Sequence, residues 1–310
     1  MMVSIICPVY NVEHFIHESI QSILQQSYTN FEFLIIDDCS NDNTLFEIRK
    51  INDPRIVLIE NSKNIGPASS LNVGLKKAIG SYIAIMHGDD IALSNRISEQ
   101  VLFMEKNIEI DILGSNYEMI NEFGKSIGSK KINSENIDER LLFHNVLCHP
   151  TIMYRSTIFK SFDLSYTEGM RLNEDYDLFT RCVVKNRKIS IVPKVLMKYR
   201  LHKSQQSFVK SKEEFKNFCE IRREFWNVKI PEMKYILDFY EHENVSKLKL
   251  YFKNKKHWSR TIDNFLIQKL HKIVKSNKKV NITLTEYLSF TLKTRFNFFS
   301  FKTLFRYFFK

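Results

Sequence analysis

Short apolar runs alternate with amphipathic stretches through the first third of the chain. The runs are rich in Val, Ile and Phe, and they predict strands at residues 3–7, 31–36, 55–59 and 82–86. Apolar residues then recur at helical spacing, which predicts helices over residues 13–26, 42–51, 67–79 and 94–106. Pro8 is expected to end the first strand, Gly80 to end the third helix, and Ser94 to cap the fourth. Strands that alternate with helices of this length predict βαβ units and a parallel sheet.

The pattern becomes mixed after residue 110 and changes again after residue 204. Strands are predicted at 111–117, 151–154, 189–192 and 195–201, with a helix over 174–185. The remainder is rich in Lys and Phe, with helical patterns near 211–228 and 232–275. We therefore predict one domain over residues 1–205, with halves of about 1–110 and 111–205, followed by a helical extension over 206–310.

Charge divides the chain at the same place. The 310 residues carry a formal net charge of +11, from 46 Lys and Arg against 35 Asp and Glu. Residues 1–200 hold 22 basic and 25 acidic residues, whereas residues 201–310 hold 24 and 10, so only the last third is basic. The sequence has no run long enough to span a membrane and no pattern of a signal peptide. Its five scattered Cys form no CxxC pair, which is typical of reduced thiols in a cytoplasmic protein.

Acidic pairs follow two of the predicted strands. Asp37-Asp38 follows the second strand and Asp89-Asp90 the fourth, while Asn61 follows the third. Parallel sheets bind ligands outside the carboxyl ends of their strands, and carboxylate oxygens suit Mg²⁺ or Mn²⁺. The alternative is that these aspartates only begin turns and helices. Glu174-Asp175 opens a predicted helix, where acidic residues either favour the helix dipole or supply a general base.

The order and spacing of four motifs are more specific than any one of them. The chain reads PVYN at 8–11, DDCSNDNT at 37–44, ENSKNIGPASSLNVGLKKAIGSYIAIMHGDD at 60–90 and NEDYDLFTR at 173–181. This order resembles the inverting nucleotide-diphosphosugar glycosyltransferases of family two over about residues 2–205. The resemblance implies the GT-A fold, an α/β fold with a Rossmann-like, mixed, mainly parallel sheet flanked by helices. It also implies that residues 1–110 bind the nucleotide and residues 111–205 the acceptor.

The resemblance implies roles for individual residues. The nucleotide-sugar would be bound by the PVYN segment and the helix after it, by the second aspartate of the second motif, by the NxG loop and by the DxD-like motif. On this chain those positions are Pro8, Tyr10, Glu13, Asp38, Asn64, Gly66 and Asp89. Asp38 would contact uracil, and Asp89 the ribose or the metal. Asp90 would bind the metal, Mn²⁺ or Mg²⁺, and the diphosphate. In the pair Glu174 and Asp175, Asp175 would be the catalytic base.

Several positions stay open. Family members often carry Ala-Arg-Asn in the third helix, where this chain has Ser70-Leu71-Asn72, so a nucleotide-contacting arginine is absent or supplied elsewhere. His149 and His202 lie in segments like those that line the acceptor and diphosphate sides of such enzymes, and each is otherwise a structural histidine. His202 is predicted as a third metal ligand or a diphosphate contact. Arg155 and Arg200 are either phosphate partners or surface charges.

The predicted function is inverting transfer of a sugar from a nucleotide-diphosphosugar, expected to be a UDP-sugar, to a hydroxyl of a saccharide or lipid-linked saccharide. The resemblance places this reaction in the synthesis of bacterial surface polysaccharide or lipopolysaccharide. The alternatives are a sugar-1-phosphate nucleotidyltransferase, a retaining transferase and a catalytically inactive nucleotide-sugar-binding module. The first of these usually has a glycine-rich loop after its first strand, and this chain has no glycine before Gly66.

Residues 291–310 combine aromatic and basic side chains without an acid. Phe298, Phe301, Phe305 and Phe308 fall on one helical stripe, with Lys and Arg between them, as in a helix that lies on an anionic membrane. The alternatives are packing on the protein's own core and an oligomer contact. Aromatic and basic residues also bind single-stranded nucleic acid, but the region lacks a recognised nucleic-acid module. We therefore expect a cytoplasmic protein held peripherally on the inner face of the cell membrane.

Overall fold

The computed structural model describes residues 1–205 and 212–229. The helices predicted near 232–275 and the aromatic stripe in 291–310 lie outside these residues. The strands are β1 (Val3–Val9), β2 (Phe31–Asp37), β3 (Ile56–Glu60), β4 (Tyr82–Ile85), β5 (Ile91–Ala92), β6 (Ile112–Asn121), β7 (Ser126–Lys130), β8 (Met153–Arg155) and β9 (Ile189–Leu201). The helices are α1 (Ile16–Leu24), α2 (Thr44–Arg49), α3 (Pro67–Lys77), α4 (Arg96–Lys106), α5 (Ile137–Leu141), α6 (Thr157–Ser161), α7 (Glu174–Val184) and α8 (Lys212–Lys229), and η1 (His149–Thr151) is a short 3₁₀ turn.

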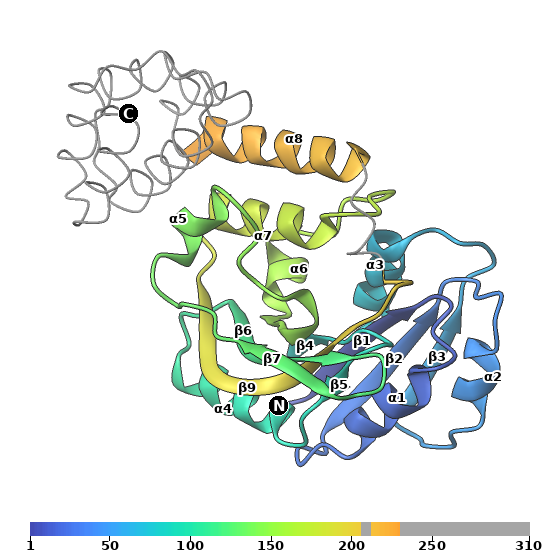
Figure 1. Cartoon of the computed structure of the whole chain (residues 1–310). Coiled ribbons are helices and arrows are strands. Elements are labelled where there is room, and N and C mark those ends of the chain that lie inside the picture. Colours follow the sequence, from blue (N-terminus) through green and yellow to red (C-terminus); the bar gives the residue numbers. More distant parts are fainter. Residues whose placement is uncertain (206–211, 230–310) are drawn as a thin grey trace, which may run out of the picture. The chain divides into compact units, whose positions relative to one another are not determined.

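One sheet runs through the described residues in the order β3-β2-β1-β4-β8-β6-β9-β5, and β7 pairs with β6 (Figure 1). The pairs β2–β3, β1–β2 and β1–β4 are parallel, which confirms the predicted βαβ arrangement of the first half. In the second half, β8 is antiparallel to both β4 and β6, while β6 and β9 are parallel. The predicted α/β fold is confirmed, and antiparallel pairs take a larger share of the sheet than expected.

The first strand continues through Pro8 instead of stopping before it. Its pairing with β4 ends at Ile6, so the missing N–H of Pro8 removes no bond on that side. The prediction that Ser94 caps α4 is also wrong, because the N-cap residue is Asn95 and its side chain makes no cap bond. Several elements too short to show a period were missed, namely β5, β7, α5, α6 and η1.

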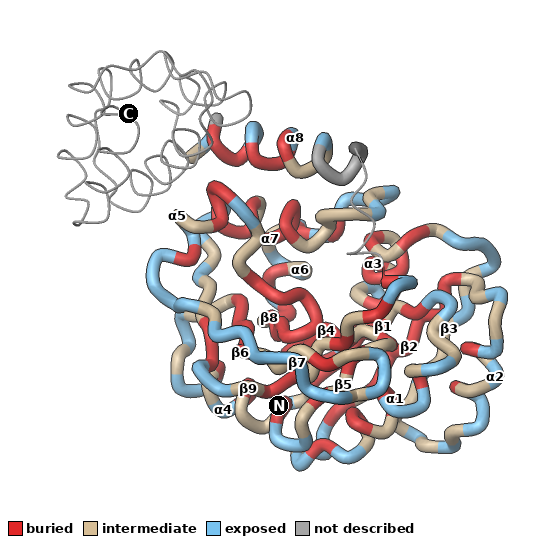
Figure 2. Tube along the Cα trace, viewed as in Figure 1, coloured by how far each residue is buried: buried red, intermediate tan, exposed pale blue. Residues whose placement is uncertain are grey.

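Helices cover both faces of the parallel part of the sheet. α3 packs on one face of β1 and β2, and α1 and α4 pack on the other (Figure 1). Strands covered on both faces read as continuous apolar runs, and the central strands β1, β2 and β4 are accordingly buried almost throughout (Figure 2). Gly74 lets α3 approach closely, since a Cβ at this position would lie 2.5 Å from Ile6 Cγ2 and 3.0 Å from Ile36 Cδ1.

The chain forms two compact units, which are described separately. The first contains residues 1–137 and 145–218, and the second contains residues 138–144 and the chain from Cys219 onward. In the second unit, the indole N–H of Trp226 donates to the carbonyl of Leu142, and its ring packs edge-on against Phe143. The predicted boundary at residues 205–206 stays a prediction, because residues 206–211 are not described.

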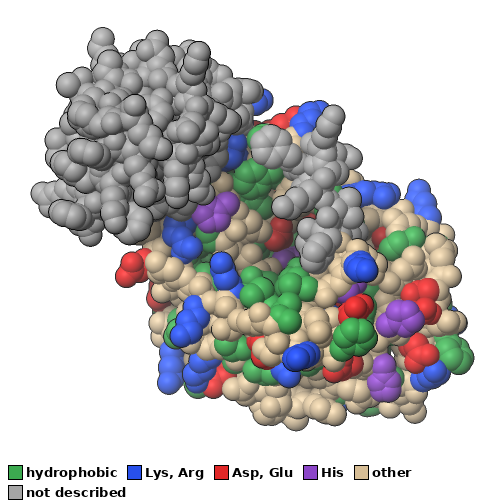
Figure 3. Space-filling view, viewed as in Figure 1, with side chains coloured by type: hydrophobic (Ala, Val, Ile, Leu, Met, Phe, Trp, Pro, Cys, Tyr) green, Lys and Arg blue, Asp and Glu red, His purple; other side chains and the backbone are tan. Residues whose placement is uncertain are grey.

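Charged side chains of both signs are interspersed on the face of the described residues drawn in Figure 3. This agrees with the nearly balanced charge of residues 1–200. No helix among residues 1–205 and 212–229 has the length and hydrophobicity to cross a lipid bilayer.

Replacing Gly74 with Ala tests the close packing of α3. Alanine gains about 1 kcal/mol in helix propensity, whereas overpacking costs about 1–3 kcal/mol. Because the new methyl would meet a side chain of a central strand at 2.5 Å, we expect overpacking to dominate. Urea unfolding should show a net loss of about 1–2 kcal/mol. Lys77→Ala, on the exposed side of the same helix, should change stability by less than about 0.5 kcal/mol. A Gly74→Ala protein as stable as the wild type would contradict this packing.

Candidate active site

The turn after β4 holds a fully buried carboxylate. Asp90 has no exposed surface, and its Oδ1 accepts a hydrogen bond of 2.8 Å from the backbone N–H of Arg200. Its Oδ2 is buried and has no hydrogen-bond partner among residues 1–205 and 212–229. Burial, and secondly the charge of Asp89, raises the pKa of this carboxyl well above its usual range. A buried acceptor without a partner costs free energy, so this oxygen is a candidate ligand for a cation.

Two residues at the end of β9 hold the same turn. The guanidinium of Arg200 donates from Nε to the carbonyl of Asp89 at 2.8 Å, and its Nη2 lies 2.6 Å from Glu18 Oε2. His202 Nε2 lies 2.9 Å from Asp89 Oδ2, and its Nδ1 lies 2.9 Å from Ser204 Oγ. The sequence analysis grouped Asp89, Asp90 and His202 as metal ligands, and the structure places His202 against Asp89.

Neither candidate arginine is a surface charge. The Arg200 side chain is 2% exposed, and the protein already occupies its guanidinium. Arg155 donates to the backbone carbonyls of Ile110, Met104 and Asn107. Both guanidinium groups therefore stabilise the fold at the sites where they lie, and neither points freely toward a phosphate.

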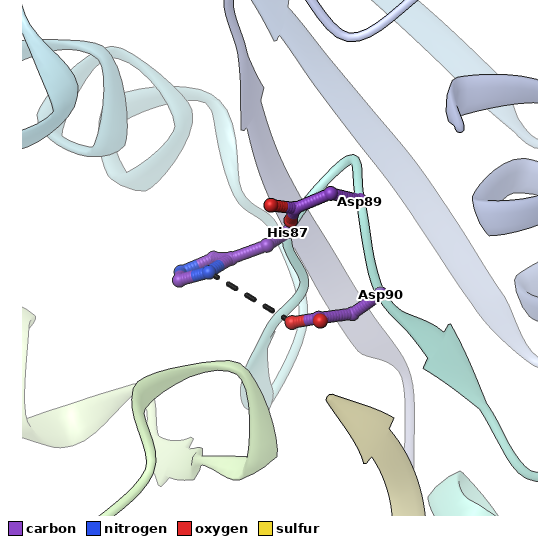
Figure 4. A group of neighbouring side chains, drawn as sticks. All are labelled: His87, Asp89 and Asp90. Atoms are coloured by element: carbon purple, nitrogen blue, oxygen red, sulfur yellow. Dashed lines mark ion pairs between the residues drawn. The ribbon is translucent and has the colours of Figure 1, made fainter. Parts of the chain in front are cut away.

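His87, Asp89 and Asp90 form a group that could hold a metal ion. Each offers one ligand atom, and the three atoms lie within 4.8 Å of one another. Figure 4 shows the His87 ring directed toward Asp90, and His87 Nδ1 lies 3.9 Å from Asp90 Oδ2. One imidazole and two carboxylates are a donor set that suits a divalent cation. The Oδ2 of Asp90, which has no hydrogen-bond partner among the described residues, is available as one of these ligands. Sequence reasoning missed His87, although it stands in the HGDD motif two residues before Asp89.

A chain of hydrogen bonds leads from His87 into the second half of the domain. His87 Nε2 lies 3.2 Å from His149 Nδ1, and His149 Nε2 lies 2.8 Å from the hydroxyl of Tyr166. Burial lowers the pKa of His87 and lowers that of His149 further, so both rings are neutral near pH 7. The side chain of Asn72 accepts from the N–H of Tyr166 and donates to its carbonyl. His149 is thus a buried link between the turn after β4 and the segment before α7.

The candidate base lies at the start of α7. Asn173 is left-handed, with φ of 65°, and the helix begins at Glu174. Asp175 Oδ1 accepts from the N–H of Tyr176, and its Oδ2 accepts from Asn145 Nδ2, both at 2.7 Å. Burial raises the pKa of Asp175 above its usual value. Burial and the neighbouring Asp175 raise the pKa of Glu174 to about 8. No sequence signal identified Asn145, because its contact with Asp175 is made only by the fold.

The charges of Asp90 and Asp175 both act on one buried thiol. Burial raises the pKa of the Cys148 thiol, and the charges of Asp90 and Asp175 raise it further. The buried Cys148 therefore lies within electrostatic reach of both the candidate metal ligand and the candidate base.

The second motif is bound to the loop before α3. Asp38 accepts hydrogen bonds from the N–H groups of Ile65 and Gly66, at 2.9 and 2.8 Å, and from Asn61 Nδ2 at 2.9 Å. Gly66 has φ of 86°, a conformation that favours glycine. Asp38 and Gly66 are therefore in direct contact, while Asn64 is exposed on the loop beside them.

The other residues predicted to bind the nucleotide lie where the PVYN motif and the segment after it meet the DDCSNDNT motif. Glu13 Oε2 accepts from the N–H of Asn43 at 2.8 Å, and the N–H of Glu13 donates to Asp42 Oδ2 at 3.1 Å. Pro8 is half-buried in β1, and Tyr10 is 40% exposed. Glu13 thus makes a structural bond between the motifs, and Tyr10 offers an open aromatic surface.

Residues 4–162 match the family described as Glycosyl transferase family 2. A protein of Haemophilus influenzae, named as an uncharacterized glycosyltransferase, is 34% identical over 82% of this chain and 81% of its own length. The Escherichia coli UDP-Glc:alpha-D-GlcNAc-diphosphoundecaprenol beta-1,3-glucosyltransferase WfgD is 35% identical over 77% of this chain and 92% of its own length. The chain belongs to glycosyltransferase family 2.

The likeness to a solved structure extends beyond the segment that the family matches. The structure of S. aureus TarS in complex with UDP-GlcNAc aligns with a TM-score of 0.64 and 22% identity, over 90% of this chain and 82% of that one. At this identity the likeness concerns the fold alone, and it supports the GT-A architecture of this glycosyltransferase. The family match ends at residue 162, before the α7 carboxylates.

Stability should depend on pH through Glu174. A carboxyl with a raised pKa stays protonated in the folded state where the unfolded chain has lost its proton. The free energy of unfolding therefore falls as pH rises from about 4.5 to about 8. In Glu174→Gln this fall should be smaller by about 1–2 kcal/mol, measured by urea unfolding at pH 5 and pH 8.5. Glu168→Gln, at an exposed position nearby, should keep the wild-type pH dependence. Identical curves for wild type and Glu174→Gln would contradict the raised pKa.

Proposed function

We propose that this family 2 glycosyltransferase transfers a sugar, with inversion, from a nucleotide-diphosphosugar to a hydroxyl of a saccharide acceptor. The observation that carries the proposal is that one domain holds two carboxylate sites of different kinds. The turn at Asp89 and Asp90 suits a cation, and Asp175 suits proton transfer. A leaving diphosphate and an attacking hydroxyl need these two different kinds of group.

The donor is proposed to be a UDP-sugar. The E. coli relative is named for UDP-Glc, and TarS was solved with UDP and with UDP-GlcNAc. Pro8, Tyr10, Glu13, Asp38, Asn64, Gly66 and Asp89 remain the proposed donor-binding residues. The arginine missing from α3 has a candidate replacement in Arg171, whose Cγ lies 3.6 Å from where a Cβ on Gly66 would be. Because Arg171 is exposed, its cation is available to the donor.

The cofactor is proposed to be Mn²⁺ or Mg²⁺, held by Asp89 and Asp90. A bound divalent cation would stabilise the negative charge that develops on the departing nucleoside diphosphate. Arg200 and His202 keep the two carboxylates in place, through the backbone N–H of Arg200 on Asp90 and the ring of His202 on Asp89.

Asp175 is proposed as the general base. A hydroxyl is a poor nucleophile until a carboxylate accepts its proton. The raised pKa of Asp175 makes its carboxylate a stronger base than an ordinary aspartate. Asn145 and the N–H of Tyr176 each bind one of its oxygens, which fixes its orientation. Attack opposite the leaving group gives one displacement with inversion, without a covalent intermediate, which distinguishes it from a retaining transferase.

The other candidate functions lack a supporting observation. Family membership favours glycosyl transfer over nucleotidyl transfer. Asp89, Asp90, Glu174 and Asp175 are all present, and each described pair is held by specific hydrogen bonds, which argues against an inactive binding module.

Asp175→Asn tests the assignment of the base. Asparagine keeps the shape of the side chain but cannot accept a proton as a carboxylate does. The turnover number should fall by about 10²–10⁴-fold, while the affinity for UDP, measured by calorimetry, should stay within about twofold. Glu168→Gln should retain wild-type turnover. Near-normal turnover in Asp175→Asn would show that another group takes the proton.

The acceptor is proposed to be lipid-linked and the enzyme to act on the cytoplasmic face of the membrane. The E. coli relative is named for an acceptor on diphosphoundecaprenol, and residues 291–310 carry the aromatic and basic pattern of an interfacial helix. We propose no nucleic-acid partner.

Sedimentation with lipid vesicles tests the membrane proposal. The full chain should sediment with vesicles that contain anionic lipid at low salt, and it should dissociate as salt rises, because screening weakens attraction to the surface. Replacing Phe298, Phe301, Phe305 and Phe308 together with Ser should reduce binding at least tenfold. Phe46→Ser, at a position in α2 that is 60% exposed, is the matched control and should not. Equal binding by both variants, or no binding by the wild type at low salt, would rule the proposal out.

A further inference from the structure

His87 differs from the other histidine near the acidic turn in having a ring nitrogen directed at the partnerless oxygen of Asp90. We propose that His87 Nδ1 is a nitrogen ligand of the divalent cation, and that His149 and Tyr166 position it. This inference rests on the proposed function in one respect: it takes the cation at Asp89 and Asp90 to be the ion used in the proposed sugar transfer.

Asp90 Oδ2 and His87 Nδ1 face each other at a separation that one metal ion can bridge. The Oδ1 of Asp90 is bound by the backbone of Arg200, and its buried Oδ2 has no hydrogen bond within the part of the chain that the structure describes. His87 Nδ1 lies 3.9 Å from this Oδ2, which is too far for a hydrogen bond. Bonds of about 2.0–2.2 Å from a metal to nitrogen and oxygen allow one ion to contact two atoms at this separation.

The opposite nitrogen of His87 is fixed by its neighbours. Nε2 lies 3.2 Å from His149 Nδ1, and His149 Nε2 lies 2.8 Å from the Tyr166 hydroxyl, which in turn lies 3.4 Å from that of Tyr154. A neutral imidazole carries one N–H, so the two rings can be oriented in only two ways. In one of them His87 Nε2 donates to His149 and His149 Nε2 donates to Tyr166. This orientation leaves the lone pair of His87 Nδ1 facing Asp90.

Hydrogen bonds of this kind commonly fix the tautomer and ring orientation of a metal-binding histidine. The side chain of Asn72 holds Tyr166 at its backbone N–H and carbonyl. The hydrogen bonds that run from His87 through His149 therefore lead to a residue whose backbone is fixed. His149 and Tyr166 are therefore positioning residues, which act on the ion through His87.

His202 is arranged differently, although the sequence analysis proposed it as the third ligand. Its Nε2 is bound to Asp89 Oδ2 and its Nδ1 to Ser204 Oγ, so both ring nitrogens already have partners. In this arrangement His202 orients the carboxylate of Asp89, and His87 supplies the nitrogen ligand of the cation.

The ligand set has a consequence for the choice of metal. Mg²⁺ is a hard cation that strongly prefers oxygen, whereas first-row transition ions accept imidazole nitrogen more readily. The enzyme should therefore bind Mn²⁺ more tightly than Mg²⁺, by about tenfold or more. His87→Asp, which replaces the nitrogen with oxygen, should bring the two affinities closer together.

Electron paramagnetic resonance on the full-length protein with Mn²⁺ alone tests the inference. Electron spin-echo modulation of bound Mn²⁺ should show a directly coordinated nitrogen in the wild type and in His202→Ala, and none in His87→Ala. His87→Ala should weaken Mn²⁺ binding by at least tenfold. His149→Phe should keep the nitrogen signal and weaken binding by about 10–100-fold, as a neighbour of a metal ligand does. Circular dichroism and thermal unfolding check that each variant is folded.

Three results would overturn the inference. They are bound Mn²⁺ without nitrogen modulation in the wild type, nitrogen modulation that persists in folded His87→Ala, and no binding of Mn²⁺ by the wild type. Unchanged affinity in His149→Phe would remove the role given to His149. If Mn²⁺ binds through His87 but no sugar is transferred, the proposed function fails and this inference stands. If sugar is transferred and the bound Mn²⁺ has no nitrogen ligand, this inference fails and the proposed function stands.

Discussion

The carboxylate of Asp90 is buried, and its position determines how several distant segments meet. One oxygen is bound by the backbone N–H of Arg200, and the other has no partner within the described residues. Leaving a polar oxygen buried without a partner costs free energy, and the surrounding contacts stabilise the arrangement. The guanidinium of Arg200 binds Glu18 in α1, the carbonyl of Asp89 and the carbonyl of Glu122 in the turn between β6 and β7. A single buried arginine therefore connects both halves of the domain to the acidic turn.

The mixed sheet explains how residues so far apart in sequence come together. The parallel strands β3-β2-β1-β4 bring the acidic motifs to one edge, where α/β sheets bind ligands. β8 pairs with β4 in the opposite direction, and η1 before it places His149 against His87. The long β9 runs beside β6 and ends at Arg200 and His202. The second half of the domain thus supplies the proposed base at α7 and the contacts that hold the acidic turn.

The sequence predicted the parallel half of the fold because its strands and helices have clear periods, and it predicted the acidic pairs because they follow those strands. It did not predict β5, β7, α5 or α6, which are too short to show a period. The contact of Asp38 with the nucleotide stays a prediction, and its hydrogen bond with Gly66 could not be read from the sequence because it depends on how two strands end. His87 and Asn145 were missed because their partners, Asp90 across the turn and Asp175 in another element, are known only from the fold. The sequence does not distinguish a phosphate partner from a surface charge at Arg200, because the burial of a single arginine cannot be read from sequence.

The central claim is that the turn at Asp89 and Asp90 is a cation site built to neutralise a nucleoside diphosphate. Anomalous X-ray diffraction from crystals grown with Mn²⁺ and UDP tests it most directly, because the anomalous signal locates the ion independently of the rest of the map. We expect one strong peak at about 2.0–2.3 Å from Asp90 Oδ2 and in contact with the UDP phosphates. UDP bound at the carboxyl edge of the parallel strands with no ion near Asp90, or an ion bound only elsewhere, would contradict the account.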